Sequence, residues 1–184
     1  MRHPALRLFQ LLCAATVTVI AAIARPLPPP PERPVWMSVL GESERADGSW
    51  AGVDLLQTPD ASIDRFQITL RPERAVRVRL EAVTDGQTEQ LYPAHAGDAV
   101  LGGGRSWAMP GPRSFFEVRG HARLRLVVAA ENNSPGADIP ARLSGAVHAV
   151  TLPLTDGSAA KIGERSLVVA AAGQAVLEVP LYGR

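Results

Sequence analysis

The sequence predicts an all-β domain, folded as an antiparallel β-sandwich or open barrel of roughly eight to ten short strands. Two observations carry this prediction: apolar and polar residues alternate along several segments, and glycine or proline turns recur between them at about ten-residue spacing. Such alternation places apolar side chains on one face of a sheet and charged side chains on the other. Beyond residue 24, no segment shows the period of a helix.

The strand predictions rest on alternating segments and on apolar runs of strand length. Asp85-Gly86 favours a tight hairpin between two of them. We expect Gly41–Gly52 to be a mobile loop and Val53–Gln57 to form a single helical turn. The predicted strands are Val35–Leu40, Phe66–Leu70, Arg74–Val83, Thr88–Tyr92, Ser114–Arg119, Ala122–Ala130, Ala146–Leu154, Leu167–Ala171 and Ala175–Val179.

The first 24 residues have the pattern of a bacterial signal helix. Three residues that carry or can carry positive charge, Arg2, His3 and Arg7, precede the apolar run Leu8–Ala24. The run ends in the small-x-small triplet formed by Ala22, Ile23 and Ala24. Signal peptidase accepts small side chains at these two positions, so we expect cleavage after Ala24 and a periplasmic or secreted protein.

Two other fates of this segment stay open. Residues 8–24 give an apolar run of 17 residues, which is the short limit for crossing a bilayer, so an uncleaved inner-membrane anchor is one alternative. A lipoprotein modified at Cys13 is the other, although Leu11 and Leu12 stand where that modification requires small residues.

After the signal segment, residues 25–34 (RPLPPPPERP) predict a proline-rich linker of polyproline II conformation. Residues 35–184 predict a single domain. Cys13 is the only cysteine, so the mature chain has neither a disulfide nor a cysteine metal site. Loss of Arg2 and Arg7 would take Lys+Arg from 19 to 17 against 18 Asp+Glu, a net charge of −1 that argues against nucleic-acid binding.

The stretch Phe66–Asn132 carries an ordered set of features: an alternating strand, an Asp-Gly hairpin, an aromatic-proline step, a glycine loop, a phenylalanine strand and a strongly apolar strand. In this order it resembles an uncharacterised bacterial β-domain family whose members are often attached to caspase-like peptidases or to kinases. The resemblance implies a β-sandwich accessory or recognition module, and it brings no active site to this chain.

No pattern in the sequence predicts catalysis, a metal or a cofactor. A G-x-S-x-G elbow is absent, and Ser106 lies in a glycine-rich turn. His95, His121 and His148 lack the close pair spacing of zinc ligands, and His148 fits a packed or edge position on an apolar strand. A small hydrolase with a site on its loops stays as an alternative.

Four arginines are the first candidate binding residues. Arg77 and Arg79 share the outward side of one predicted strand, and Arg123 and Arg125 share that of another. If these strands pair, four guanidinium groups gather on one face, which would suit an anionic glycan, a lipid headgroup or an acidic protein surface. The alternatives are that Glu81 and Glu117 neutralise this face, or that the strands lie in different sheets.

Two tryptophans are the second set of candidates. Trp50 and Trp107 lie in predicted loops bounded by glycine and proline, where an indole ring can stack on a sugar, fill a partner's pocket or cap the open end of the sandwich. Trp36 lies in an apolar predicted strand, so we expect it in the core.

Together these features favour an exported, non-enzymatic recognition or accessory module of the bacterial envelope, which binds an unidentified envelope protein or an anionic glycan or lipid through a sheet face or edge. Contact with a membrane is expected only through an uncleaved signal segment. A structural subunit completed by β-strand addition is the alternative, with Ser166–Val179 as an apolar segment suited to strand addition if it lies at an edge.

Overall fold

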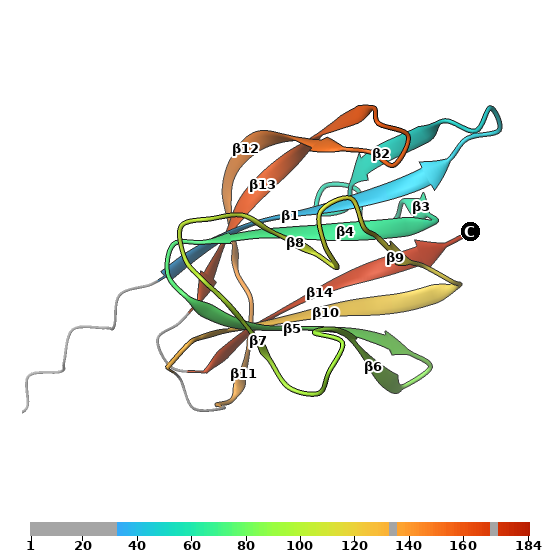
Figure 1. Cartoon of the computed structure of the whole chain (residues 1–184). Helices are drawn as coiled ribbons and strands as arrows, with labels where there is room; N and C mark the ends of the chain where they lie inside the picture. The colour runs from blue at the N-terminus through green and yellow to red at the C-terminus, as the bar shows by residue number, and fades with distance from the viewer. Residues whose placement is uncertain (1–32, 133–135, 170–172) are drawn as a thin grey trace, which may run out of the picture. The chain divides into compact units, whose positions relative to one another are not determined.

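The computed structural model describes residues 33–132, 136–169 and 173–184, and in these residues the chain forms strands and turns without a helix (Figure 1). The predicted signal segment, its cleavage residues Ala22 and Ala24, and residues 25–32 of the predicted linker lie outside the described residues. The described part includes no helix with the length and hydrophobicity needed to cross a membrane.

Two seven-stranded sheets make up the fold. Sheet A has the order β12-β13-β1-β4-β8, with β2 also paired to β1 and β9 to β4. All its pairs are antiparallel. Its strands are β1 (Arg33–Glu44), β2 (Trp50–Asp54), β4 (Arg65–Pro72), β8 (Trp107–Met109), β9 (Phe116–Glu117), β12 (Leu143–Pro153) and β13 (Ala159–Val169).

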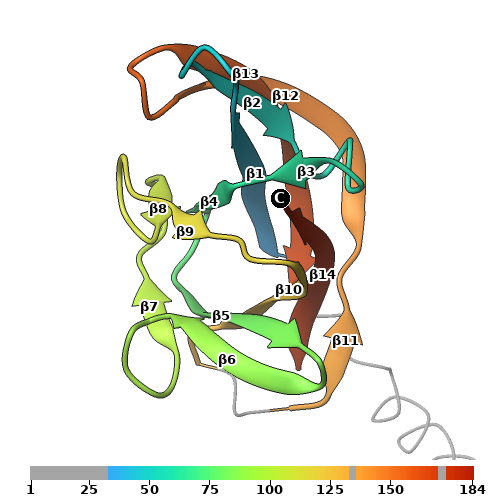
Figure 2. The same ribbon diagram turned by 90° about the vertical axis from the view of Figure 1, so that its right-hand side faces the viewer.

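Sheet B has the order β11-β14-β10-β5-β6, with β3 also paired to β14 and β7 to β5 (Figure 2). The pairs of β14 with β11 and with β3 are parallel, and the others are antiparallel. Its strands are β3 (Ser62–Ile63), β5 (Val76–Thr84), β6 (Gln87–Tyr92), β7 (Ala99–Leu101), β10 (His121–Ala130), β11 (Asp138–Pro140) and β14 (Gln174–Gly183).

The predicted all-β class is confirmed, and the inner faces of the sheets pack in a sandwich-like way. The main core joins alternate residues of β1, β4 and β13 from sheet A with alternate residues of β5, β10 and β14 from sheet B. The predicted alternation of buried and outward-facing residues is confirmed. In β5, the buried residues are Val76, Val78 and Leu80, whereas Arg77 and Arg79 face outward and are half-buried. The described strands outnumber the expected eight to ten, because several have only two or three residues.

The edge of β1 that faces β13 is divided between two partners. Its first half, Arg33–Met37, pairs with β13, and its second half, Leu40–Glu44, pairs with β2 along the same edge. The first residues of β13 therefore leave the plane of β1, and the β12–β13 hairpin covers the outer face of the β1–β2 hairpin. This contact buries a second core of Leu40, Leu154 and Ile162, with Trp50, Phe115, Val150, Leu152 and Ala160 around it.

The expected loop Gly41–Gly52 is wrong. β1 continues to Glu44 and β2 begins at Trp50, so that only residues 45–49 form a turn, closed by the bond from Arg45 N–H to the Ser49 carbonyl (2.8 Å). In this segment Gly52 packs against the second core, and Glu42 forms a buried ion pair with Arg65. The expected turn over Val53–Gln57 forms only after β2 ends at Asp54, where Thr58 N–H bonds to the Asp54 carbonyl (2.9 Å).

Three further expectations are corrected. Arg33 and Pro34 belong to β1, so the linker ends earlier than residue 34. The predicted strand Ser114–Arg119 shrinks to the two residues of β9. Trp36 lies on the outer face of sheet A rather than in the core, with its ring 4.9 Å from that of His148 and 5.6 Å from the Arg71 guanidinium, because its neighbours Val35 and Met37 occupy the inner face.

The contact between the two hairpins generates a stability prediction at Gly52. A Cβ added there would lie 2.4 Å from Ala160 Cβ and 3.0 Å from Leu154 Cδ2. We expect Gly52→Ala to lower the free energy of unfolding by about 1–3 kcal/mol, because the hairpins must separate to admit the methyl group. Urea unfolding measures the change. Gly102→Ala is the control, since its added Cβ meets only a Trp107 ring atom at 4.0 Å. Equal stability of the two variants would contradict the packing described.

Candidate functional site

The four candidate arginines lie on one face, as the sequence predicts for paired strands. β5 and β10 are neighbours in sheet B, and their register sets Arg125 opposite Glu81, Arg123 opposite Val83 and Arg79 opposite Val127. These side chains occupy the outer face, because Val78 and Leu80 on β5 face the core.

This face also carries acids that pair with its arginines. Glu81 accepts hydrogen bonds from Arg79 Nε (2.6 Å) and Arg125 Nη1 (2.7 Å). Arg79 also bonds to Asp98 (2.9 Å), and Arg125 pairs with Asp138. Glu81 is 7% exposed, so the two guanidinium groups supply the polar contacts that water gives elsewhere.

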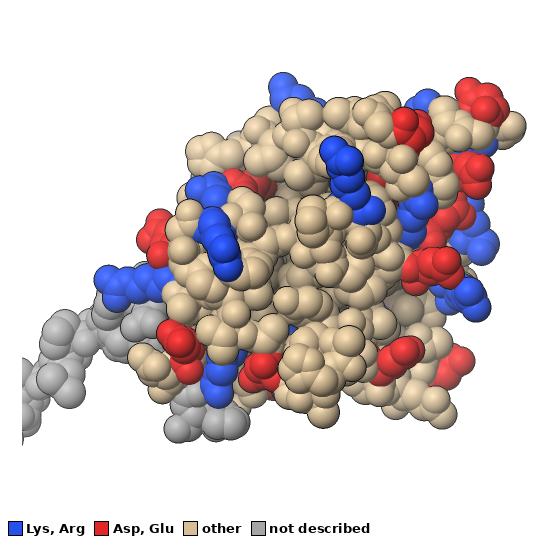
Figure 3. Space-filling view, in the orientation of Figure 1, with Lys and Arg blue, Asp and Glu red and all other residues tan. Residues whose placement is uncertain are grey.

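Arg123 completes the set through an exposed pair with Glu178 at 3.4 Å. The face thus carries four acids for its four candidate arginines, so the predicted accumulation of positive charge is compensated. The acids are Glu81, Asp98, Asp138 and Glu178. Neutralisation by Glu81 was one of the two alternatives drawn from the sequence. Glu117 takes no part, because it pairs with Arg119 (2.9 Å). The face of the molecule seen in Figure 3 likewise intersperses acidic and basic side chains without a continuous patch of either sign.

Arg125 and Arg79 lower the pKa of Glu81. Burial raises the pKa of this carboxyl group, but hydrogen bonds from Arg125 and Arg79 outweigh burial and leave its pKa below the ordinary value of 4.5. The pKa of Arg125 is raised, chiefly by its bond to Glu81. Both directions describe an ion pair that is fully charged at neutral pH.

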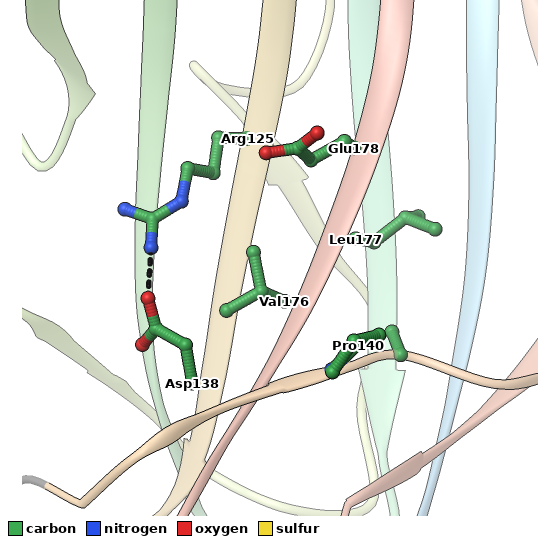
Figure 4. Close-up of a pocket in the computed structure, with 7 residues that line it drawn as sticks. Arg125, Asp138, Pro140, Val176, Leu177 and Glu178 are labelled. Atoms are coloured by element: carbon green, nitrogen blue, oxygen red, sulfur yellow. Dashed lines mark hydrogen bonds and ion pairs between the residues drawn. The ribbon is translucent and has the colours of Figure 1, made fainter.

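A groove of about 470 Å³ opens beside this network, between β10, β14 and β11. In Figure 4, Arg125 points from β10 toward Asp138 on β11, and Glu178 lies beside Arg125 on the neighbouring strand β14. Its floor is mostly apolar, with Pro140, Val176 and Leu177. The guanidinium group in this groove is already held by two carboxylates, so an anionic ligand would have to displace one of them.

The two candidate tryptophans are held by the fold. Trp50 begins β2, and the Arg65 guanidinium carbon lies 3.3 Å from its ring centroid. Arg65 in turn bonds to the fully buried Glu42 (2.8 Å). Trp107 begins β8, donates its indole N–H to the Gly102 carbonyl (2.9 Å) and lies beneath the Arg105 guanidinium (3.8 Å). Both rings are half-buried in these contacts, and both begin strands instead of lying in the loops that the sequence predicts.

No group of three or more His, Cys, Asp or Glu side chains that could hold a metal occurs within residues 33–132, 136–169 and 173–184. His121 contacts the Tyr182 ring (5.3 Å), and His148 contacts Trp36. The expectation that the chain has no catalytic residue, no metal and no cofactor stays a prediction.

Sequence reasoning missed a different feature, the outer edge of β12. This strand of 11 residues is at the border of sheet A, and β13 is its only strand partner in the part of the chain that the structure describes (Figure 2). The strand itself was predicted, as Ala146–Leu154, but a local pattern does not tell an edge strand from a central one. Strand addition was predicted for Ser166–Val179, if that segment lies at an edge. The structure places Ser166–Val169 between β1 and β12, and Gln174–Val176 between β10 and β11. Leu177–Val179 pairs with β10 on one side and has no second strand partner among the described residues, so for these three residues strand addition stays a prediction.

Hydrogen-bond geometry shows which groups of β12 face outward. Leu154 N–H bonds to the Ser158 carbonyl (2.8 Å) at the turn, and antiparallel pairing alternates along the strand from there. Leu152, Val150 and His148 therefore bond to β13, and Thr151, Ala149 and Val147 direct N–H and C=O away from it. The bond from Gly163 N–H to Asp54 Oδ2 (2.9 Å) supports this phase, because Gly163, the partner of Ala149, bonds on the side opposite β12.

Natural proteins block edge-to-edge pairing with charged side chains, prolines, bulges and covering segments. In the part of the chain that the structure describes, the middle of this edge has none of them. The bulge of β12 lies before Val147, and its proline, Pro153, comes at the last residue. From 147 to 152 the register is regular, and His148 is the only residue able to carry a charge. The edge is open over six residues, the usual length of a strand.

Comparison of the chain with protein-family models, with curated proteins and with solved structures finds no match in any of the three. The resemblance stated for Phe66–Asn132 therefore stays a prediction.

The carboxyl group shared by two arginines generates the second prediction. We expect Glu81→Gln to lower the free energy of unfolding at neutral pH by about 1–3 kcal/mol, because Arg79 and Arg125 lose their common counter-charge; solvent screening moderates the cost, as their side chains are 26% and 23% exposed. Thermal or urea unfolding provides the measurement. Glu178→Gln is the matched control on the same face, with an expected change within about 0.5 kcal/mol because its ion pair is exposed.

The same pair of variants tests the charge itself. Because folding lowers the pKa of Glu81, the stabilisation is present above the ordinary value of 4.5 and is lost as the pH falls through the lowered pKa. The difference in unfolding free energy between the wild type and Glu81→Gln should therefore shrink in this acid range and stay constant around neutral pH. A difference that persists unchanged in acid would show that shape, rather than charge, makes the contribution.

Proposed function

We propose that the chain is an exported, non-enzymatic recognition module of the bacterial envelope, which binds an extended segment of a protein partner alongside β12. The observation that carries the proposal is the open edge of β12. An added strand would receive hydrogen bonds from Ala149 and Thr151 and would extend sheet A by one strand.

The contrast between the two candidate surfaces supports this choice. The arginine face of sheet B is internally paired, so a ligand there must break ion pairs before it gains contacts. The β12 edge offers backbone groups with which no strand of the described residues pairs, and a hydrogen bond to an added strand replaces one to water at little net cost. Export is supported by the basic start, apolar run and small-x-small ending of residues 1–24.

A proline on the edge tests the proposal. Ala149 is exposed and its N–H faces outward, so Ala149→Pro removes a hydrogen-bond donor and fills the edge without breaking the β12–β13 ladder. A photo-crosslinking residue at Thr151, whose side chain is exposed, should capture a defined partner in intact cells of the producing bacterium. The crosslink should disappear with Ala149→Pro and persist with Ala149→Ser, which keeps the N–H.

Two controls sharpen the result. A crosslinker at Val100, 54% exposed on β7 of sheet B, reports contacts unrelated to the edge. Ala149→Pro should unfold at a temperature close to that of Ala149→Ser, which separates loss of binding from loss of folding. An absent crosslink at Thr151, a crosslink that survives Ala149→Pro, or capture only through Val100 would each overturn strand addition at β12.

A further inference from the structure

We infer that the strand accepted by β12 carries acidic side chains on one face and apolar side chains on the other. This inference rests on the proposed function and specifies its partner. It follows from the two faces that the β12–β13 hairpin presents to a neighbour, and above all from two cationic side chains of β13, Lys161 and Arg165.

The first face of the hairpin is apolar. Val150 and Leu152 are half-buried against the second core, and the ring of His148 contacts Trp36 on the same outer face of sheet A. Side chains of an added strand on this face would lie beside those of β12, within the distance at which cross-strand pairs interact. Apolar residues on the added strand would therefore extend the second core outward.

The opposite face is cationic. Lys161 pairs with Thr151, and Arg165 pairs with Val147. The two cations are four residues apart on β13, so they lie on the same face of the hairpin. Among the described residues, neither cation has an acidic group within ion-pair distance, whereas Arg65, Arg71, Arg79 and Arg125 all do. Arg165 Nε is in addition buried without a hydrogen-bond partner in the described part of the chain.

The acids nearby are already engaged. Glu164 points to the other face, where it bonds to Arg71 (2.5 Å). Asp54 accepts hydrogen bonds from Gly163 N–H and Leu56 N–H, both 2.9 Å long, and forms no ion pair with Lys161 or Arg165. The positive charge on this face is therefore left for an outside partner.

A carboxylate on an added strand can reach these cations. Neighbouring strands lie about 5 Å apart, so β13 and the added strand are separated by about 10 Å across β12. Beside Lys161 on this face stand the small side chains of Ala149 and Thr151 on β12, and Gly163 lies between the two cations on β13. Long side chains, glutamate from one side and lysine or arginine from the other, span this gap together.

A second copy of this chain fits the edge less well. Leu143–Pro153 contains neither Asp nor Glu, so pairing of β12 with itself would bring no carboxylate to this face. It would instead place two copies of Lys161 and two of Arg165 along one surface, and like charges destabilise such an arrangement. The charges therefore favour an acidic partner strand over self-association.

Short peptides provide a direct test. The probes are two capped peptides with an N-terminal dye, TVEVEVT with glutamate on one face and TVKVKVT with lysine in its place, and fluorescence anisotropy measures their binding to the domain. We expect the glutamate peptide to bind about fivefold more tightly than the lysine peptide at low salt, with the ratio falling as salt is added. Lys161→Glu should reverse the preference, whereas Arg113→Glu, an exposed change in a loop far along the chain, should preserve it.

The design separates failure of this inference from failure of the proposed function. In one outcome both peptides bind the wild type equally well, Ala149→Pro abolishes their binding and Lys161→Glu changes nothing. Strand addition then stands and the acidic partner is wrong. If both peptides bind equally to the wild type and to Ala149→Pro, or if neither binds, the edge is not the binding surface and both proposals fail. A concentration-dependent dimer that Ala149→Pro dissolves would instead identify a second copy as the occupant.

Discussion

The arrangement of sheet A depends on one constraint: each N–H and C=O along the edge of β1 can bond to a single partner strand. β2 occupies this edge at Leu40–Glu44 and β13 at Arg33–Met37. The start of β13 is thereby forced out of plane and carries β12 with it over the β1–β2 hairpin. The second core around Leu40 and the close approach at Gly52 follow from this displacement. So does the position of β12, which ends at the border of the sheet with no strand beyond it among the described residues.

Charge is distributed over the fold in two different ways. On sheet B, two arginines converge on a nearly buried Glu81, and their second carboxylates come from β11 and from the segment before β7. In this network each of the two arginines already bonds to two carboxylates, so an anionic ligand would have to displace one of them. On the β12–β13 hairpin, Lys161 and Arg165 have no acidic partner among the described residues and lie near backbone groups of β12 that no described strand pairs with. The combination of an open ladder and uncompensated charge is what distinguishes this edge from the rest of the described surface.

The sequence predicts the amphipathic strands well, because alternation reflects the two environments of a sheet directly. β5 and β10 lie where the pattern predicts them. So does the Asp-Gly turn after β5, with φ values of 51° at Asp85 and 78° at Gly86. The prediction fails for the end of β1 and for β2. Glu42 and Gly52 are residue types that favour a loop, and they fit strands here because Glu42 pairs with Arg65 and Gly52 packs against Ala160, which are distant in the sequence. The candidate arginines were placed correctly, but their compensation was only partly foreseeable, because Asp98 and Asp138 come from loops and a short strand. The edge of β12 depends on strand order, which local periodicity does not encode.

The central claim is that β12 offers one open row of backbone groups while the other row is bonded to β13. Amide hydrogen exchange followed by NMR tests it residue by residue. The account predicts alternating protection: His148, Val150 and Leu152 exchange slowly, whereas Ala149 and Thr151 exchange at rates near those of exposed turns. Uniform protection along β12 would show that the edge is already covered within the folded chain, and uniform fast exchange would show that β12 is not held in sheet A; either result would contradict the account.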